Sequence, residues 1–210
     1  MNSLKDIPEK LFVSGTDTEI GKTVISASLV QGMRTDYWKP VQAGTEPMTD
    51  TERVRQWTEF PGRTFHQETY RLKLPMSPHA ASADEKITIS MDSFKVPDIS
   101  GRRLITEGAG GLLVPLNDKE MILDLIVQLN FPVLLVARSG LGTINHTLLS
   151  LKALRDNGAR VWGVVLNGPR HNSNEEAIRF YGDIENLFSF PELEKITPNT
   201  LNKAFIQTFT

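Results

Sequence analysis

The chain has 210 residues, of which 40% are hydrophobic and 23% are charged, and its formal net charge is −2. This composition is typical of a globular protein with a sizeable core, and the small charge argues against a nucleic-acid partner or an anionic membrane surface. The absence of cysteine excludes disulfides, thiolate metal sites and a cysteine nucleophile. We expect residues 1–210 to form a single domain in a reducing cytoplasm, without a membrane span.

The first predicted unit is a strand, a loop and a helix. The apolar residues 11–13 predict a short buried strand, residues 15–23 (GTDTEIGKT) form a glycine-bounded loop, and a helix follows. This order is typical of a phosphate-binding loop, whose amides and helix N-terminus face a polyphosphate. Lys22 would reach the outer phosphates, and the Thr23 hydroxyl would hold Mg²⁺. The strict GxxxxGK[ST] pattern is not met, because Thr16 occupies the position of its first glycine.

A second strand is predicted to end near Pro40, because proline cannot donate to a ladder. Lys39 therefore lies where a strand gives way to a loop, the position at which open α/β sheets bind ligands. Residues 51–59 predict a short helix capped by Asp50 or Thr51, and for Asp50 a cap is favoured over a metal-linked carboxylate. The proline-containing residues 61–83 predict irregular structure.

A third strand is predicted at residues 104–106, and its end would deliver Glu107 into a glycine-rich turn. A buried strand end has no structural need for a carboxylate, whereas Mg²⁺ beside a phosphate loop takes oxygen ligands. The glycines that follow would let the backbone approach a ligand closely. We therefore interpret this stretch as part of a ligand site.

The rest of the chain alternates helices and strands, predicted at residues 120–129, 132–137, 147–157, 161–166 and 175–187. Residues 188–210 give no clear prediction. The alternation, with strands apolar on both faces, indicates an α/β fold with a doubly wound, mainly parallel sheet and helices on both faces. Right-handed crossovers would bring the strand ends to one edge, at Gly15, Lys39, Glu107, Ala137 and Asn167. The polar and glycine-rich stretches share that edge, which supports a P-loop protein that uses Mg²⁺ and a nucleotide.

Several of these stretches resemble the dethiobiotin synthetase family, in that family's order and from about Leu11 to about Leu193. They are residues 15–23, 39–41, 77–79, 107–111, 142–146 and the strand-terminal Asn167. The resemblance implies a P-loop α/β homodimer that uses ATP to close 7,8-diaminononanoate with CO2 into dethiobiotin. One amine would take up CO2 as a carbamate, which attacks the γ-phosphate to give a carbamic–phosphoric anhydride. The second amine would then close the ring and expel phosphate.

The same resemblance implies site residues. The catalytic pair would be Lys22 and Lys39, beside the carbamate and the γ-phosphate, and the Mg²⁺ ligands would be Thr23, Asp50 and Glu107. The ATP contacts would be Glu19, Ile20, Gly21, Lys22, Thr23, Val24, Asp50, Glu107, Gly108, Ala109, Gly110, Asn167 and Pro191. The contacts with the diamine substrate would be Thr18, Ala43, Gly111, Thr143 and Asn145, the last two meeting its carboxylate across the dimer.

The sequence departs from the family at Ala43, where many relatives carry a hydroxyl residue, and at Gly168, where an acidic residue often follows the asparagine. One alternative is a switch ATPase of the partitioning type, but residues 16–20 lack the second lysine that such loops usually carry. A small-molecule kinase would need an arginine-rich lid, and the only dense basic pair is residues 102–103. A relative that binds nucleotide without turnover is the third alternative, which Ala43 leaves open.

Overall fold

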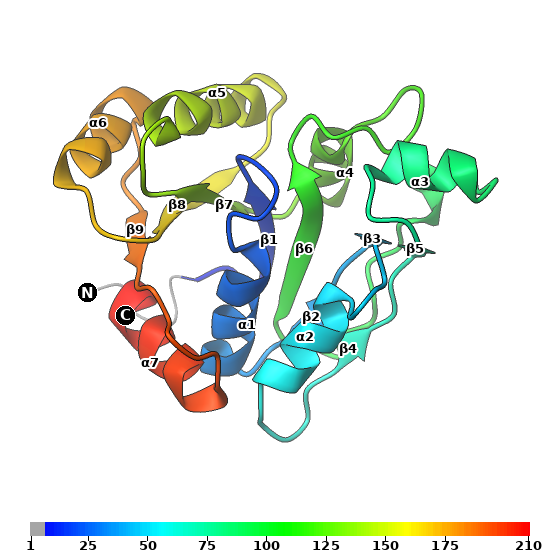
Figure 1. Cartoon of the computed structure of the whole chain (residues 1–210), viewed down its shortest axis with the longest axis horizontal. Helices are drawn as coiled ribbons and strands as arrows, with labels where there is room; N and C mark the ends of the chain where they lie inside the picture. The colour runs from blue at the N-terminus through cyan, green and yellow to red at the C-terminus, as the bar shows by residue number, and fades with distance from the viewer. Residues whose placement is uncertain (1–6) are drawn as a thin grey trace.

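The computed structural model describes residues 7–210 and has a seven-stranded parallel sheet at its centre (Figure 1). The strand order is β4-β2-β6-β1-β7-β8-β9. The strands are β1 Lys10–Gly15, β2 Asp36–Trp38, β4 Phe65–His66, β6 Leu104–Gly111, β7 Val133–Arg138, β8 Val161–Asn167 and β9 Leu187–Phe190. Two further strands, β3 Val41–Ala43 and β5 Tyr70–Leu72, form a small parallel sheet beside it.

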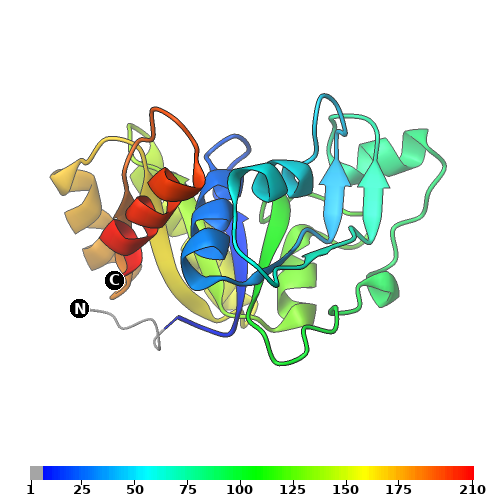
Figure 2. The same cartoon turned by 90° about the horizontal axis from the view of Figure 1, so that it is seen from below.

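Helices cover both faces of the large sheet (Figures 1 and 2). They are α1 Lys22–Met33, α2 Asp50–Trp57, α3 Pro78–Asp84, α4 Ile122–Leu129, α5 Thr143–Asp156, α6 Asn172–Gly182 and α7 Pro198–Phe209, with one 3₁₀ turn at Met91–Ser93. Along β1, Leu11 and Val13 pack in a cluster with α1 and α7, whereas Phe12 packs in a second cluster with α4. The alternation of side chains along a strand explains why β1 is apolar throughout.

The predicted fold class is confirmed, and the parallel pairing brings the carboxyl ends of the strands to one edge. In register, Gly15 pairs with Gly111 and Val136, and Arg138 pairs with Asn167. The loops that follow these strands therefore lie together. Among residues 7–210, no helix combines the length and the apolar character that crossing a membrane requires.

Several predicted boundaries are wrong. Residues 61–83 are not irregular, because they hold β4, β5 and α3. Helix α5 begins at Thr143 rather than at residue 147, directly after Gly142, whose φ of 88° turns the chain into the helix. Helix α6 ends at Gly182, where Asp183 adopts a left-handed conformation, so that Leu187 belongs to a strand instead of to the predicted helix.

Candidate active site

The loop between β1 and α1 has the geometry of an anion site. Helix α1 begins at Lys22, and its N-cap residue Gly21 has φ 93°, a conformation that favours glycine. Glycine has no side chain with which to cap the helix, so the amide donors of the first turn remain available to an anion. Lys22 folds back over the loop, and its ammonium donates a hydrogen bond to the Asp17 carbonyl oxygen at 2.8 Å.

The Lys22 side chain is buried, with only 7% of the residue exposed. Burial, followed by the repulsion of Lys39, lowers the pKa of Lys22 from 10.5 to about 8. The protein itself therefore places too little negative charge around the Lys22 ammonium to offset its burial. A polyphosphate placed against the loop would supply the missing negative charge.

Lys39 is almost fully buried and lies between two carboxylates. Its Nζ is 2.8 Å from Oδ2 of Asp50 and 3.1 Å from Oε1 of Glu107, and it donates to the Gly108 carbonyl oxygen at 3.2 Å. Burial alone would lower the pKa of Lys39, but the charges of Glu107 and Asp50 outweigh that effect and raise it. For Asp50, burial is likewise outweighed, and the Lys39 ammonium lowers the pKa of the carboxyl. The three groups therefore form a charged cluster.

Glu107 is inside a strand and not at its end, which corrects the sequence prediction. Strand β6 continues through the glycines to Gly111, with an irregular register where it passes Ser14 of β1. Gly108 is needed there because a Cβ atom would come within 2.9 Å of the Phe12 ring. The Glu107 carboxylate has 0% exposure and accepts hydrogen bonds from Thr23 Oγ1 at 2.9 Å and from Tyr37 at 3.0 Å.

The predicted capping role of Asp50 is wrong. Thr49 is the N-cap of α2, with its hydroxyl accepting from the Glu52 amide at 3.2 Å, while Glu52 in turn accepts from the Thr49 amide at 2.8 Å. This reciprocal box satisfies the helix start and leaves Asp50, the first helical residue, free to turn towards Lys39. Asp50 instead forms an ion pair with Lys39 at 2.8 Å.

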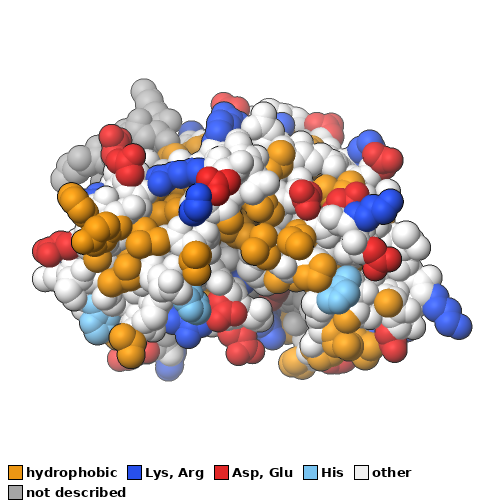
Figure 3. Space-filling view, turned by 90° about the horizontal axis from the view of Figure 1, so that it is seen from above, with side chains coloured by type: hydrophobic (Ala, Val, Ile, Leu, Met, Phe, Trp, Pro, Cys, Tyr) orange, Lys and Arg blue, Asp and Glu red, His pale blue; other side chains and the backbone are white. Residues whose placement is uncertain are grey.

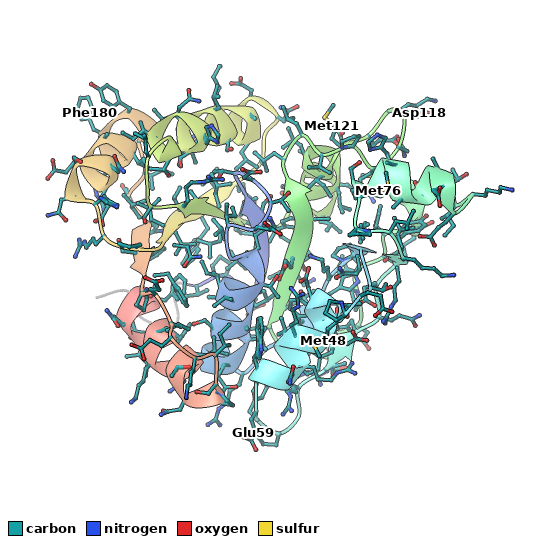
Figure 4. The ribbon with its side chains drawn as sticks, in the orientation of Figure 1. Met48, Glu59, Met76, Asp118, Met121 and Phe180 are labelled. Carbon is teal, nitrogen blue, oxygen red and sulfur yellow. The ribbon has the colours of Figure 1, made fainter. Side chains whose placement is uncertain are left out.

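A cavity of about 610 Å³ opens above this cluster, and Met76 at its lining is labelled beside α3 in Figure 4. Most of the predicted site residues line it, namely Thr18, Glu19, Gly21, Lys22, Thr23, Val24, Lys39, Ala43, Asp50, Glu107, Ala109 and Gly110. Sequence reasoning missed Gln42, Arg53, Trp57, Pro75, Met76 and Val114. Two of these, Arg53 and Trp57, follow Asp50 at helical spacing along α2, a signal that could have found them.

Two further cavities hold other predicted residues. One of about 380 Å³ is lined by Gly111 and Asn145, together with Leu113 and Leu149. Thr143 does not line it: the residue is buried, with its hydroxyl 3.4 Å from that of Thr147. The other predicted substrate residues divide between two cavities, and Thr18 lines both of them.

The other, of about 560 Å³, is lined by Asn167, Arg138 and residues 17–20. Asn167 Nδ2 donates to the Ile20 carbonyl oxygen at 2.9 Å, so the asparagine also holds the loop. Because Asn167 pairs with Phe190 of β9, Pro191 follows at the same edge of the sheet. The predicted base contacts Asn167 and Pro191 are therefore neighbours.

The residues proposed from sequence as Mg²⁺ ligands converge. The Thr23 hydroxyl donates a hydrogen bond to Glu107, and Asp50 pairs with Lys39, which also pairs with Glu107. The atoms that these three residues offer to a metal are all oxygens. Within residues 7–210 there is no group of three or more His, Cys, Asp or Glu residues placed to hold a metal. Two carboxylates and a hydroxyl nevertheless suit Mg²⁺, which is usually held by one or two carboxylates with substrate phosphates and waters. The donor set fits the ion.

Comparison with known proteins agrees with this architecture. A family model described as an AAA domain matches residues 9–200. An ATP-dependent dethiobiotin synthetase BioD of Rhodopseudomonas palustris is 42% identical over 200 residues, which cover 95% of each chain. A protein of the same name from Cytophaga hutchinsonii is 41% identical, over 96% of this chain and 97% of the relative.

Solved structures share the fold at much lower identity. A ParA family ATPase from Chlorobium tepidum has a TM-score of 0.54 at 11% identity, over 96% of this chain and 91% of that one. The MinC:MinD cell division protein complex of Aquifex aeolicus contains a chain with a TM-score of 0.52 at 12% identity, over 94% and 86%. These likenesses concern the P-loop α/β fold and carry no information about the reaction.

Proposed function

The chain belongs to the family of ATP-dependent dethiobiotin synthetases, and from this premise we propose that it closes 7,8-diaminononanoate with CO2 into dethiobiotin at the expense of ATP. The observation that carries the proposal is the buried Lys39 ammonium, held 2.8 Å and 3.1 Å from two carboxylates in the cavity that Lys22 also lines. A reaction between a carbamate and a γ-phosphate must bring two anions together. Two neighbouring ammonium groups supply the opposing charge.

The position of each residue in the cavity determines the role that we assign to it. The amides of residues 19–24 receive the phosphates at the start of α1, and Lys22 leaves the Asp17 carbonyl to meet the outer ones. Lys39 turns from its carboxylates towards the carbamate oxygen that attacks the γ-phosphorus as ADP departs. The second amine then attacks the carbamoyl carbon and expels phosphate. The site contributes mainly orientation and fixed charge.

We assign the metal role to Thr23, Asp50 and Glu107. When bound, Mg²⁺ would neutralise charge on the β- and γ-phosphates. Asp50 and Glu107 would hold the ion through the carboxylate oxygens that contact the Lys39 ammonium here.

We also propose that two copies pair through the face around the 380 Å³ cavity. Leu113, Leu141 and Leu149 are 63%, 100% and 61% exposed, and the first and last of them line that cavity with Asn145. Figure 3 views the molecule from above and shows hydrophobic side chains gathered between charged ones on this side. Burial of these leucines against a second copy would complete the cavity that Gly111 and Asn145 line.

Phosphate release from ATP tests the proposal against its rivals. With bicarbonate and Mg²⁺ present, release should depend on the added diamine, and dethiobiotin should appear in equal amount. A switch ATPase would release phosphate without the diamine, and a binding protein would release none. Diamine-independent release, or its complete absence, would remove the synthetase assignment.

A further inference from the structure

One buried polar group in the site has no part in the mechanism above. Tyr37 of β2 is fully buried, and its hydroxyl donates to Oε2 of Glu107 at 3.0 Å. In the sheet register Tyr37 pairs with Ile105, which places Glu107 two residues further along the neighbouring strand. Diagonal pairs of this kind are within reach of a long aromatic side chain.

The two oxygens of Glu107 have different surroundings. Oε1 accepts from Thr23 and Lys39, which both line the 610 Å³ cavity, whereas Oε2 accepts from Tyr37 in the interior of the sheet. A glutamate carboxylate rotates readily about its last side-chain torsion unless hydrogen bonds hold both of its oxygens. The tyrosine bond fixes the plane of the group and directs a single oxygen to the cavity.

We propose that Tyr37 is a positioning residue that sets the orientation of Glu107 for Mg²⁺. The inference rests on the proposed function and extends it to a residue one strand away from the metal ligands. Outer partners of metal ligands orient the ligand atoms, and their removal typically weakens metal binding by about 10–100-fold. Tyr37 has the contact, the burial and the strand position for that role.

The tyrosine ring has a separate structural role. It lies in the core cluster with Ile25 and Leu29, and its centroid is 6.4 Å from that of Phe65. A phenylalanine would keep this packing and remove only the hydroxyl. Tyr37→Phe is therefore a clean probe of the bond to Glu107.

The test measures metal binding directly. The protein is saturated with a non-hydrolysable ATP analogue and titrated with Mn²⁺, which is followed by electron paramagnetic resonance. Tyr37→Phe should weaken Mn²⁺ binding by about tenfold, and the Mg²⁺ concentration for half-maximal phosphate release should rise by a similar factor. The matched control is Tyr70→Phe, which removes a hydroxyl bonded to the Ser90 amide at 2.9 Å and should leave Mn²⁺ binding unchanged.

Unchanged Mn²⁺ binding in Tyr37→Phe would overturn the proposal, as would equal weakening in Tyr70→Phe. If Tyr37→Phe fails to fold, it is combined with Glu107→Gln, which removes the buried charge. Recovery of the fold would show that the hydroxyl serves Glu107, and continued failure would show that the hydroxyl stabilises the fold independently of Glu107, which would overturn the proposal. A wild-type protein that binds Mn²⁺ with nucleotide yet forms no dethiobiotin would refute the proposed function, while the metal titration would still decide the role of Tyr37.

Discussion

The Lys39 ammonium lies 2.8 Å from Oδ2 of Asp50, although the two residues come from different parts of the fold. Lys39 follows β2 of the large sheet, whereas Asp50 begins α2 after the small strand β3. Their contact joins the sheet edge to the helix that forms one wall of the 610 Å³ cavity. The buried ammonium is thus both a structural counter-ion and the residue that we assign to the reaction.

Lys39→Gln separates these two roles. ATP affinity should change by less than about threefold, because Lys22 and the loop amides hold the phosphates. Phosphate release that depends on the diamine should fall by about two to three orders of magnitude, since one opposite charge at ~4 Å contributes about 4 kcal/mol at an effective dielectric near 20. Calorimetry and a steady-state assay measure the two effects.

Two comparisons strengthen that test. Lys39→Arg should not restore the rate fully, because a planar fork does not replace a compact ammonium. Lys152→Gln removes an exposed lysine paired with Asp156 at 2.8 Å and should behave as the wild type. Near-normal ring closure in Lys39→Gln would move the interpretation to the ATPase or binding-protein alternatives.

Lys22 gives the ligand-free protein a specific pH dependence. A pKa lowered from 10.5 to about 8 corresponds to about 3 kcal/mol of unfavourable free energy for the charged form. Below about pH 8 the folded chain bears this cost in full. Between about pH 8 and 10.5 the unfolded chain binds more protons than the folded chain, so the contribution of Lys22 to stability rises with pH.

Lys22→Met should therefore raise the melting temperature at neutral pH and reduce its rise towards alkaline pH, while weakening ATP binding. Melting curves across the pH range, recorded without nucleotide, check this expectation. A variant that is less stable than the wild type at neutral pH would show that the Asp17 carbonyl already compensates the ammonium.

The fold could be predicted from sequence to the extent that local pattern determines it. The apolar run of β7 and the loop before Lys22 carry their signal in adjacent residues. Strand β9 carries no such local signal, because three of its four residues are only half-buried at the edge of the sheet. Its apolar residues also follow those of α6 closely in sequence, so the two elements are hard to separate by pattern. The helix α7 depends on packing against α1, where Gly32 admits the Phe205 ring.

The site residues also divide into those that a local sequence pattern indicates and those that depend on contacts distant in sequence. Lys22, Thr23 and Lys39 could be identified because each stands next to a strand end or a helix start. Tyr37 could not, because its contact with Glu107 joins residues 70 positions apart. The ion pair of Asp50 with Lys39 could not be predicted either, because Asp50 and Thr49 are equally suited by residue type to cap the helix, and only the structure shows that Thr49 does so.

Glu107→Gln preserves the shape of the side chain and removes its charge. It should raise the Mg²⁺ concentration needed for activity by at least about tenfold without unfolding the protein, since Asp50 still balances Lys39. Activity measured against Mg²⁺ concentration, together with a melting curve, checks both parts. Lower thermal stability with a normal Mg²⁺ requirement would mean that the residue is purely structural.

Leu149→Glu addresses the proposed dimer. Leu149 is 61% exposed, so a glutamate costs the single chain little, but in an interface it would bury a charge. The variant should run as a monomer in size-exclusion chromatography with light scattering, and ring closure should fall while ATP binding persists. Ile206→Glu, at a 54% exposed position on α7, is the control and should leave the dimer intact. A dimeric Leu149→Glu protein would place the interface elsewhere.

The most direct test of the central claim is the fate of one oxygen atom. If a carbamate oxygen attacks the γ-phosphorus and later leaves with it, bicarbonate labelled with ¹⁸O must transfer label to the released phosphate. Mass spectrometry of the phosphate, under conditions faster than exchange of label with water, should show one ¹⁸O atom for each ring closed. Unlabelled phosphate accompanying dethiobiotin would contradict the account.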